Sequence, residues 1–206
     1  ANIADTVRTL ASDQFQGRAP GTIGEERTVG YLIGRLQAMG LEPAGKDGGW
    51  TQPVPLLHTA LGAPTKLAFG GKGATPLVQG TDIYVSTLQP NDVAAVAGAP
   101  LVFVGYGVTA PERGWDDFKG VDLKGKVAVF LINDPDFVAA KGEDAFGKFG
   151  GKTMTYYGRW TYKFEEAARR GAVAALIVHD ADGVGYGWNV VKSGGGENYG
   201  LVVPPE

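Results

Sequence analysis

Two almost uninterrupted apolar runs constrain the fold of this chain more than any other feature. They read "LVFVGYG" from Leu101 and "VAVFLIN" from Val127. A strand with one solvated face alternates apolar and polar residues, so runs of this kind predict strands that are buried on both faces, as at the centre of a sheet. We therefore expect central strands at Pro100–Tyr106 and Lys126–Asn133, and further strands at Val54–His58, Lys66–Phe69, Ile83–Val85 and Ala174–His179.

A helix is predicted directly before the last of these strands, over "TYKFEEAARRG". Thr161 can cap its start, and Gly171 supplies a left-handed residue at its end. Glutamates early in the helix and arginines in its last turn complement the helix dipole. The residue spacing predicts one inward face, formed by Trp160, Phe164, Ala167 and Ala168.

The first 40 residues are predicted to form two helices. The second begins at a capping box made by Thr22 and Glu25, and it ends near Gly40. Two helices of this length need a partner surface to be stable. Because the composition changes near residue 52, we expect an incomplete helical segment at residues 1–52 and a β-rich domain at residues 53–206. The expected fold class is α+β.

Composition narrows the chemistry that this chain can carry. It has 206 residues, a formal net charge of -3, no cysteine and only two histidines, His58 and His179. The charge gives no basic field for nucleic acid, and no apolar run approaches the roughly 18 residues that span a bilayer. Thiol chemistry is excluded, and a histidine-rich metal site has at most two candidates.

Three stretches resemble ligand-binding motifs but have ordinary structural interpretations. "GEDAFGKFGGKT" has two Gly-Lys pairs, yet Phe149 follows the first where a phosphate loop needs a hydroxyl, and Phe146 replaces the glycine that the second requires. "HDADG" offers metal-ligand types at a point where a strand must turn. "GWDDFKGVDLKGK" lacks the closing glutamate of a calcium loop, which favours a polar connection between strands.

The stretch "MTYYGRWTYK" is the strongest candidate for a recognition surface. It crowds Tyr156, Tyr157, Arg159 and Trp160 together. Tyrosine, tryptophan and arginine dominate binding hot spots, because they combine large contact area with directional polar groups. The alternative is that Trp160 belongs to the helix face and that the tyrosines cover the sheet.

Longer motifs resemble a known family. "LASDQFQGRAPGTIGEERTVGYLIGRLQAMGLEPAG" is similar to the opening of the co-catalytic zinc aminopeptidases related to aminopeptidase Y and glutamate carboxypeptidase. "APLVFVGYGVTAPERGWDDFKGVDLKGKVAVFLINDP" and "KFEEAARRGAVAALIVHDADGVGYGWNVV" resemble the protease-associated (PA) domain that many members carry as an insertion. The resemblance implies a PA-type domain with mixed sheets or an open barrel, preceded by two helices of a peptidase domain.

The resemblance also implies what is missing. Members bind two zinc ions through residues that follow the PA insertion, beginning with an H-x-D motif, and this sequence has no H-x-D. No catalytic or metal-ligating residue can therefore be assigned, and the two zinc ions are expected in the remainder of a parent chain. This fragment is expected to be non-catalytic by itself.

The expected role is a lid that shapes substrate access to the peptidase domain of the same parent chain. Its expected partners are that domain and peptide substrates, with no nucleic acid. Tyr156, Tyr157, Arg159 and Trp160 are the expected substrate face, and Arg18 on the interhelix loop is a further candidate. The family implies a periplasmic or extracellular location. A stand-alone peptide- or protein-binding module is the alternative.

Overall fold

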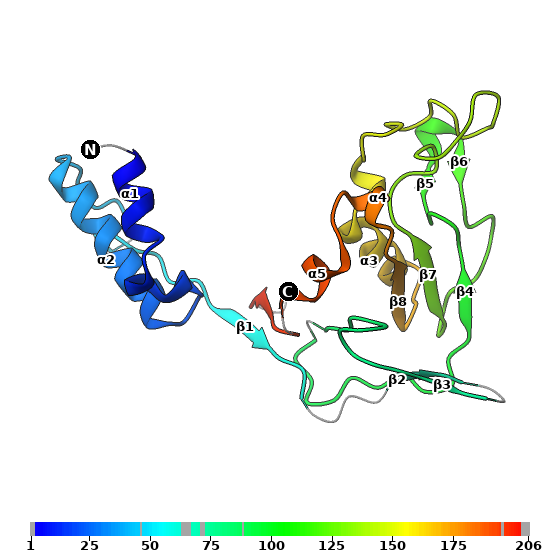
Figure 1. Cartoon of the computed structure of the whole chain (residues 1–206), viewed down its shortest axis with the longest axis horizontal. Coiled ribbons are helices and arrows are strands. Elements are labelled where there is room, and N and C mark those ends of the chain that lie inside the picture. Colours follow the sequence, from blue (N-terminus) through cyan, green and yellow to red (C-terminus); the bar gives the residue numbers. More distant parts are fainter. Residues whose placement is uncertain are drawn as a thin grey trace. The chain divides into compact units, whose positions relative to one another are not determined.

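The computed structural model describes residues 3–45, 47–62, 67–70, 73–87, 89–194 and 196–202. The chain divides into two units, Ala1–Pro55 and Leu56–Glu206, and each is described by itself. Figure 1 labels the elements of both units in chain order. Of the expected strand at Lys66–Phe69, the first residue lies outside the described residues.

The N-terminal unit is a helical segment with little interior. It comprises α1 (Ile3–Leu10), the 3-10 turn η1 (Asp13–Arg18) and α2 (Ile23–Ala38). The Thr22 hydroxyl caps α2 by accepting from the Glu25 backbone N–H at 3.4 Å, while the Glu25 carboxylate accepts from the Gly21 N–H at 2.6 Å. Among the described residues of this unit, only Phe15 and Gly24 are buried.

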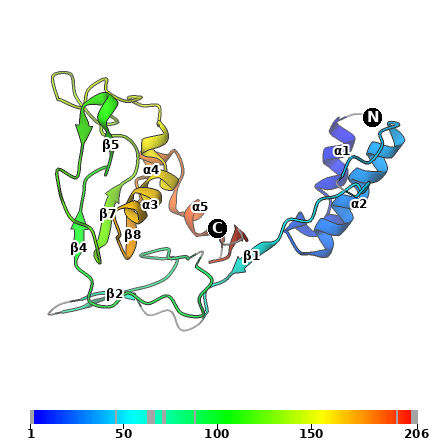
Figure 2. The same cartoon turned by 180° about the vertical axis from the view of Figure 1, so that it is seen from behind.

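The larger unit is organised around a three-stranded parallel sheet, with strand order β4-β7-β8. Its strands are β4 (Leu101–Phe103), β7 (Val127–Leu131) and β8 (Ala174–Val178). Seen from behind in Figure 2, β7 runs between β4 and β8. The expected central strand at Lys126–Asn133 is therefore present and central.

Three antiparallel pairs complete the strands of this unit. They are β1 (Leu56–Thr59) with β9 (Asn198–Leu201), β2 (Leu67–Phe69) with β3 (Thr75–Leu77), and β5 (Thr109–Ala110) with β6 (Trp115–Asp116). The described residues thus form a mixed α+β structure with small sheets and no closed barrel. The helical elements of this unit are η2 (Pro111–Arg113), η3 (Tyr156–Gly158), α3 (Trp160–Arg169), α4 (Ala181–Val184), α5 (Trp188–Val191) and η4 (Lys192–Gly194).

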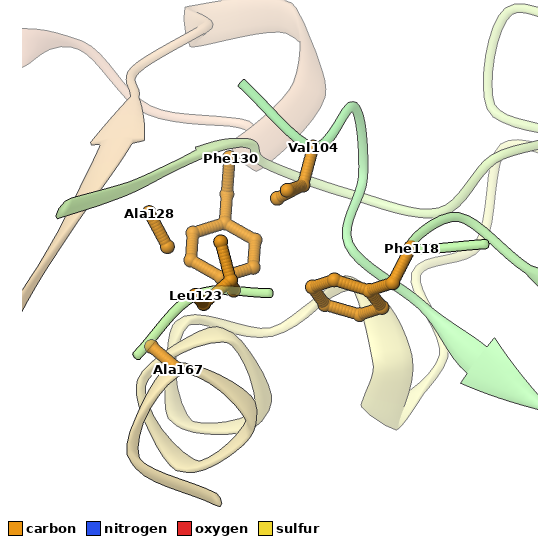
Figure 3. Close-up of a cluster of buried hydrophobic side chains, with 6 residues drawn as sticks. All are labelled: Val104, Phe118, Leu123, Ala128, Phe130 and Ala167. Carbon is orange, nitrogen blue, oxygen red and sulfur yellow. The ribbon is translucent and has the colours of Figure 1, made fainter. Parts of the chain in front are cut away.

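One face of the parallel sheet forms the core. Figure 3 shows Phe130 of β7 with Leu123 next to its ring, Val104 and Phe118 to one side, and Ala167 on the neighbouring helix α3. Phe118 and Phe130 are fully buried. Burying a phenylalanine side chain contributes roughly 1.5–3 kcal/mol, so these two rings are a large part of what fixes α3 on the sheet.

The other expected central strand is an edge strand instead. Among the described residues, β4 pairs only with β7, and Leu101 and Phe103 are 50% and 63% exposed. The prediction of burial on both faces was wrong for β4, because continuous apolarity does not reveal whether another layer covers each face of the strand. The expected strand at Ile83–Val85 is also absent; Ile83 makes only an isolated bridge with Gln79.

The buried face of α3 differs from the expected one. It consists of Tyr162, Lys163, Glu166 and Ala167, whereas Phe164 is 49% exposed and Ala168 is exposed. The helix is rotated because the strand ends offer hydrogen-bond partners that its polar residues can use. The residue at the N-cap is Arg159 rather than Thr161.

Candidate functional site

The candidate site is the segment from Tyr156 to Trp160, which enters α3 through η3. It is fixed to the residues that follow the central strand β7. The Asn133 backbone N–H donates to the Gly158 carbonyl oxygen at 3.0 Å. A Cβ added to Gly158 would lie 3.0 Å from the Asn133 backbone and 2.7 Å from Met154 Cγ, so only glycine fits this approach.

Asn133 itself adopts a left-handed backbone conformation, with φ of 79°. Asparagine tolerates that region better than most residues because its short amide can bond locally. Here the Asn133 amide nitrogen donates to the Gly183 carbonyl at 2.6 Å, and its oxygen accepts from the Asp134 N–H at 2.7 Å. The side chain thereby joins the end of β7 to α4.

Two buried carboxylates hold the loop that leads into the segment. Asp134 accepts from the Thr155 N–H at 2.6 Å and from its hydroxyl at 2.9 Å. Asp136 accepts from the backbone N–H groups of Phe149 and Gly151 at 2.9 and 3.1 Å. Charge-assisted bonds to backbone donors are among the stronger hydrogen bonds, so both ends of the loop are firmly placed.

Lys163 of α3 is fully buried and helps to hold the backbone next to the segment. Its ammonium donates to the carbonyl oxygen of Asn133 at 3.1 Å and to that of Tyr106. Burial lowers the pKa of Lys163 to about 8, and the charges of Asp134 and Asp117 oppose this shift. The ammonium therefore links α3 to the residues that follow β4 and β7.

The same burial acts on groups near this lysine. It raises the pKa of Asp117, although bonds from the Val108 N–H and the Trp115 indole favour the carboxylate. It also raises the pKa of the Tyr106 phenol. Lys163, Asp117 and Tyr106 therefore lie in a region of low dielectric, where burial disfavours the charged form of each group.

Tyr157 belongs to an internal aromatic cluster. Its ring meets those of Phe149 and Tyr162 edge to face, with centroids 5.8 and 5.1 Å apart. The Arg113 guanidinium lies 5.5 Å from the Tyr157 ring centroid, and the phenol donates to Glu112 at 2.8 Å. That hydrogen bond raises the pKa of Tyr157. The Tyr157 side chain therefore packs against the turn between β5 and β6.

Tyr156 and Arg159 are the outward members of the segment. Tyr156 is 50% exposed, and its phenol donates to Glu165 at 2.7 Å, which raises its pKa. Arg159 is exposed, and within the described part of the chain its guanidinium has no carboxylate or hydrogen-bond partner. Every other arginine of this unit has one: Arg113 pairs with Glu112, and Arg169 and Arg170 pair with Glu166.

Trp160 points the other way, toward a second group of rings. Its centroid is 6.4 Å from that of Tyr186, which is 5.9 Å from His179. The Trp160 indole nitrogen and both His179 nitrogens are buried and have no hydrogen-bond partner among the described residues. The four segment residues therefore divide into two outward side chains and two packed ones.

Arg18 is in the N-terminal unit, and its guanidinium donates to the Leu10 carbonyl oxygen. Its backbone φ of 62° places it in the left-handed region. The side chain thus closes the turn between α1 and α2. Arg18 and the Tyr156–Trp160 segment belong to different units, so a shared role for them stays a prediction.

The motif-like stretches have structural roles in the larger unit. Asp180 of "HDADG" caps α4 by accepting from the Asp182 N–H at 3.2 Å. Phe149, at the failed hydroxyl position of the loop, packs on Trp115. No group of three or more histidine or acidic side chains suited to a metal ion occurs among the residues that the structure describes.

Sequence reasoning missed the residues that support the segment. Asn133, Asp134 and Asp136 follow a buried strand directly, which is where ligand-facing and loop-fixing residues gather in parallel sheets. Their position directly after the strand could have identified these residues from the sequence. Lys163 gave none, because a lysine in a helix normally faces water.

No protein-family model, curated protein or solved structure matches this chain. No helix in the described ranges is long and apolar enough to cross a membrane.

Proposed function

We propose that this chain is an N-terminal peptidase segment followed by a PA domain of an exported zinc aminopeptidase, and that the domain is a non-catalytic lid over the active-site cleft. The open-barrel form implied by the family is part of this proposal, as are the two zinc ions of the remaining parent chain. Two observations support this proposal. The sequence carries the motifs described above, and the helix α3 followed by the strand β8 matches the helix-then-strand order of the PA-like stretch that begins at Lys163.

One observation carries the lid role. The unpaired guanidinium of Arg159 projects beside the half-exposed Tyr156, while Asn133, Asp134 and Lys163 fix the backbone beneath them. Because the backbone is already held, binding has to order only the side chain, and a guanidinium recognises carboxylates through two parallel N–H bonds. The segment is therefore suited to position an acidic group of a peptide substrate.

Such a contact would act on substrate positioning rather than on bond cleavage. Binding energy from a group remote from the reacting atoms lowers the barrier by orienting the substrate. Arg159 is then a specificity residue in this proposal, and Tyr156 contributes an aromatic surface for the aliphatic part of the substrate.

The test compares matched peptides in the parent enzyme. For a peptide with glutamate next to the scissile residue, Arg159→Ala should lower kcat/KM about tenfold, the scale of one charge-assisted hydrogen bond. For the same peptide with glutamine, the change should be at most about twofold. Lys141→Ala, at another exposed cation, is the control. Equal losses on both peptides, or no loss, would contradict the proposed contact.

The stand-alone binding module remains the second proposal, favoured by the same exposed arginine. It requires saturable peptide binding by the 206-residue chain alone. Calorimetric titration with the glutamate peptide separates the two proposals, because a lid without its cleft should bind weakly. The parent assignment is checked separately by reading the native gene for an H-x-D motif beyond Glu206.

A further inference from the structure

A hollow of about 240 Å³ lies between the turn after β3 and the helical residues after β8. It is lined by Gln79, Gly80, Tyr84 and Lys192. Its two sides are tied together, because the Trp188 indole of α5 donates to the Gly80 carbonyl at 3.0 Å. The volume is slightly below the roughly 300 Å³ of small drug pockets, which suits a ligand of amino-acid size.

The acceptors around this hollow already hold donors. The Gly80 carbonyl accepts from Trp188, and the Gln79 amide oxygen accepts from the Val85 N–H at 3.0 Å. The Tyr84 phenol oxygen accepts from the Gly196 N–H at 2.9 Å. Asp82, the acidic residue of the same turn, accepts from the Val78 N–H at 2.9 Å.

Several donors at the hollow have no partner among the described residues. The Tyr84 hydroxyl oxygen accepts from the Gly196 N–H, and its own proton can still be donated to a ligand. The Gln79 amide nitrogen donates one proton to the Val85 carbonyl at 3.1 Å and keeps a second. Lys192 adds a positive charge, and its ammonium has no partner within the described ranges, unlike Lys126 and Lys148, which pair with aspartates.

We propose that this hollow binds a small organic carboxylate. The ligand carboxylate accepts from the Lys192 ammonium and the Tyr84 hydroxyl, and the Gln79 amide donates to a neighbouring oxygen. The positive charge of Lys192 favours an anionic ligand over a neutral one. This inference is independent of the proposed lid, because none of its residues belongs to the Tyr156–Trp160 segment.

The test is an NMR titration of the ¹⁵N-labelled 206-residue chain. The probe is N-acetylglycine, a carboxylate with an otherwise neutral amide, and N-acetylglycinamide is its uncharged match. The chain has four tryptophans, so four indole N–H signals are expected. The Trp188 signal reports on the hollow through Gly80, while that of Trp115, bonded to Asp117, is an internal reference.

We expect the Trp188 signal to shift saturably with N-acetylglycine and not with its amide. Lys192→Gln should weaken this binding about tenfold, and Tyr84→Phe should weaken it several-fold, because each removes a charge-assisted bond. Lys141→Gln, which removes an exposed cation elsewhere, should bind like the wild type. Unchanged dispersion of the other indole signals shows that each variant is folded.

Three results would overturn the inference. They are the absence of a saturable shift, an equal shift with the amide, and binding that Lys192→Gln leaves unchanged. A parallel titration with inorganic phosphate decides the anion class, and saturable binding of phosphate without N-acetylglycine would contradict the carboxylate assignment.

Discussion

The buried ammonium of Lys163 lies 3.1 Å from the Asn133 carbonyl oxygen, at the point where the central strand has just ended. It also bonds the Tyr106 carbonyl, so one side chain of α3 satisfies backbone acceptors from two neighbouring strand ends. Unpaired buried carbonyls are costly, and this cation removes that cost at two places at once.

Replacing this lysine by an apolar side chain of similar length should destabilise the larger unit. Lys163→Met leaves both carbonyls without a donor, and we expect a loss of about 2 kcal/mol in the free energy of unfolding. Urea denaturation monitored by tryptophan fluorescence measures it. Lys124→Met, at an exposed lysine of the same unit, should change stability by less than about 0.5 kcal/mol. A Lys163→Met variant as stable as the wild type would show that the bonds contribute nothing net.

The pH dependence of stability should carry the signature of the same group. The pKa of Lys163 is lowered from 10.5 to about 8 in the folded protein, so above pH 8 the unfolded chain binds more protons than the folded one. Stability must then rise with pH across this window. Between pH 7 and 9.5 the gain should be at most about 2 kcal/mol.

The measurement is the difference in free energy of unfolding between the wild type and Lys163→Met at several pH values. The difference should grow in favour of the wild type as pH rises from 7 to 9.5, while the contributions of other groups cancel. A difference that does not vary with pH would place the pKa of the folded lysine near its ordinary value.

Asn133 should be replaceable by glycine at lower cost than by alanine. Both substitutions remove the bonds to Gly183 and Asp134, but alanine must also adopt a φ of 79°. Allowing for the greater freedom of glycine in the unfolded chain, Asn133→Ala should be less stable than Asn133→Gly by about 0.5–1 kcal/mol. Thermal denaturation of the pair measures the difference, and the reverse order would contradict the assigned backbone strain.

Asp134 should control the local mobility of the Tyr156–Trp160 segment. Its carboxylate holds both the N–H and the hydroxyl of Thr155. In Asp134→Ala, amide hydrogen exchange at Thr155 should be at least about tenfold faster, because a protecting charge-assisted bond is lost. Thr155→Val removes the hydroxyl bond alone and should have a smaller effect. Equal exchange in Asp134→Ala and the wild type would mean that the loop is fixed by other contacts.

Two phenylalanines on neighbouring strands should respond very differently to truncation. Phe130 is fully buried in β7, so Phe130→Ala should cost about 3–5 kcal/mol. Phe103 is 63% exposed on β4, and Phe103→Ala should cost less than about 1 kcal/mol. Denaturation midpoints of the two variants test the exposure of the face of β4 that carries Phe103. Similar losses would indicate that a further element covers β4.

These two strands also show how far the sequence could predict the fold. Apolar runs located β4, β7 and β8, because strands that pack in a core are apolar whatever their neighbours are. The boundaries are close for β7 and β8, whereas the expected strand at Pro100–Tyr106 extends well beyond the end of β4 at Phe103. The apolar runs could not distinguish a central strand from an edge strand, which depends on chain segments far away in the sequence. Nor could they show that the face of β4 carrying Phe103 is open to solvent, where this side chain is 63% exposed.

The same limit applies to the candidate site. Residue type identified Tyr156 and Arg159 as candidates for recognition, and the structure places both at the surface. Helical periodicity placed Phe164 inside and gave no reason to bury Lys163. The face that α3 buries is set by the backbone carbonyls of Tyr106 and Asn133, which Lys163 bonds. The sequence does not show that these two carbonyls lie together, because that depends on how the strands pair.

The sparse interior of the N-terminal unit has a consequence for calorimetry. Its described residues bury only Phe15 and Gly24, while Ile3 and Val7 of α1 are 81% and 58% exposed. The heat capacity increment of unfolding scales with the apolar surface that becomes hydrated, and this segment has little left to hydrate. The heat-capacity step recorded when the whole chain unfolds would therefore report almost entirely on residues 56–206.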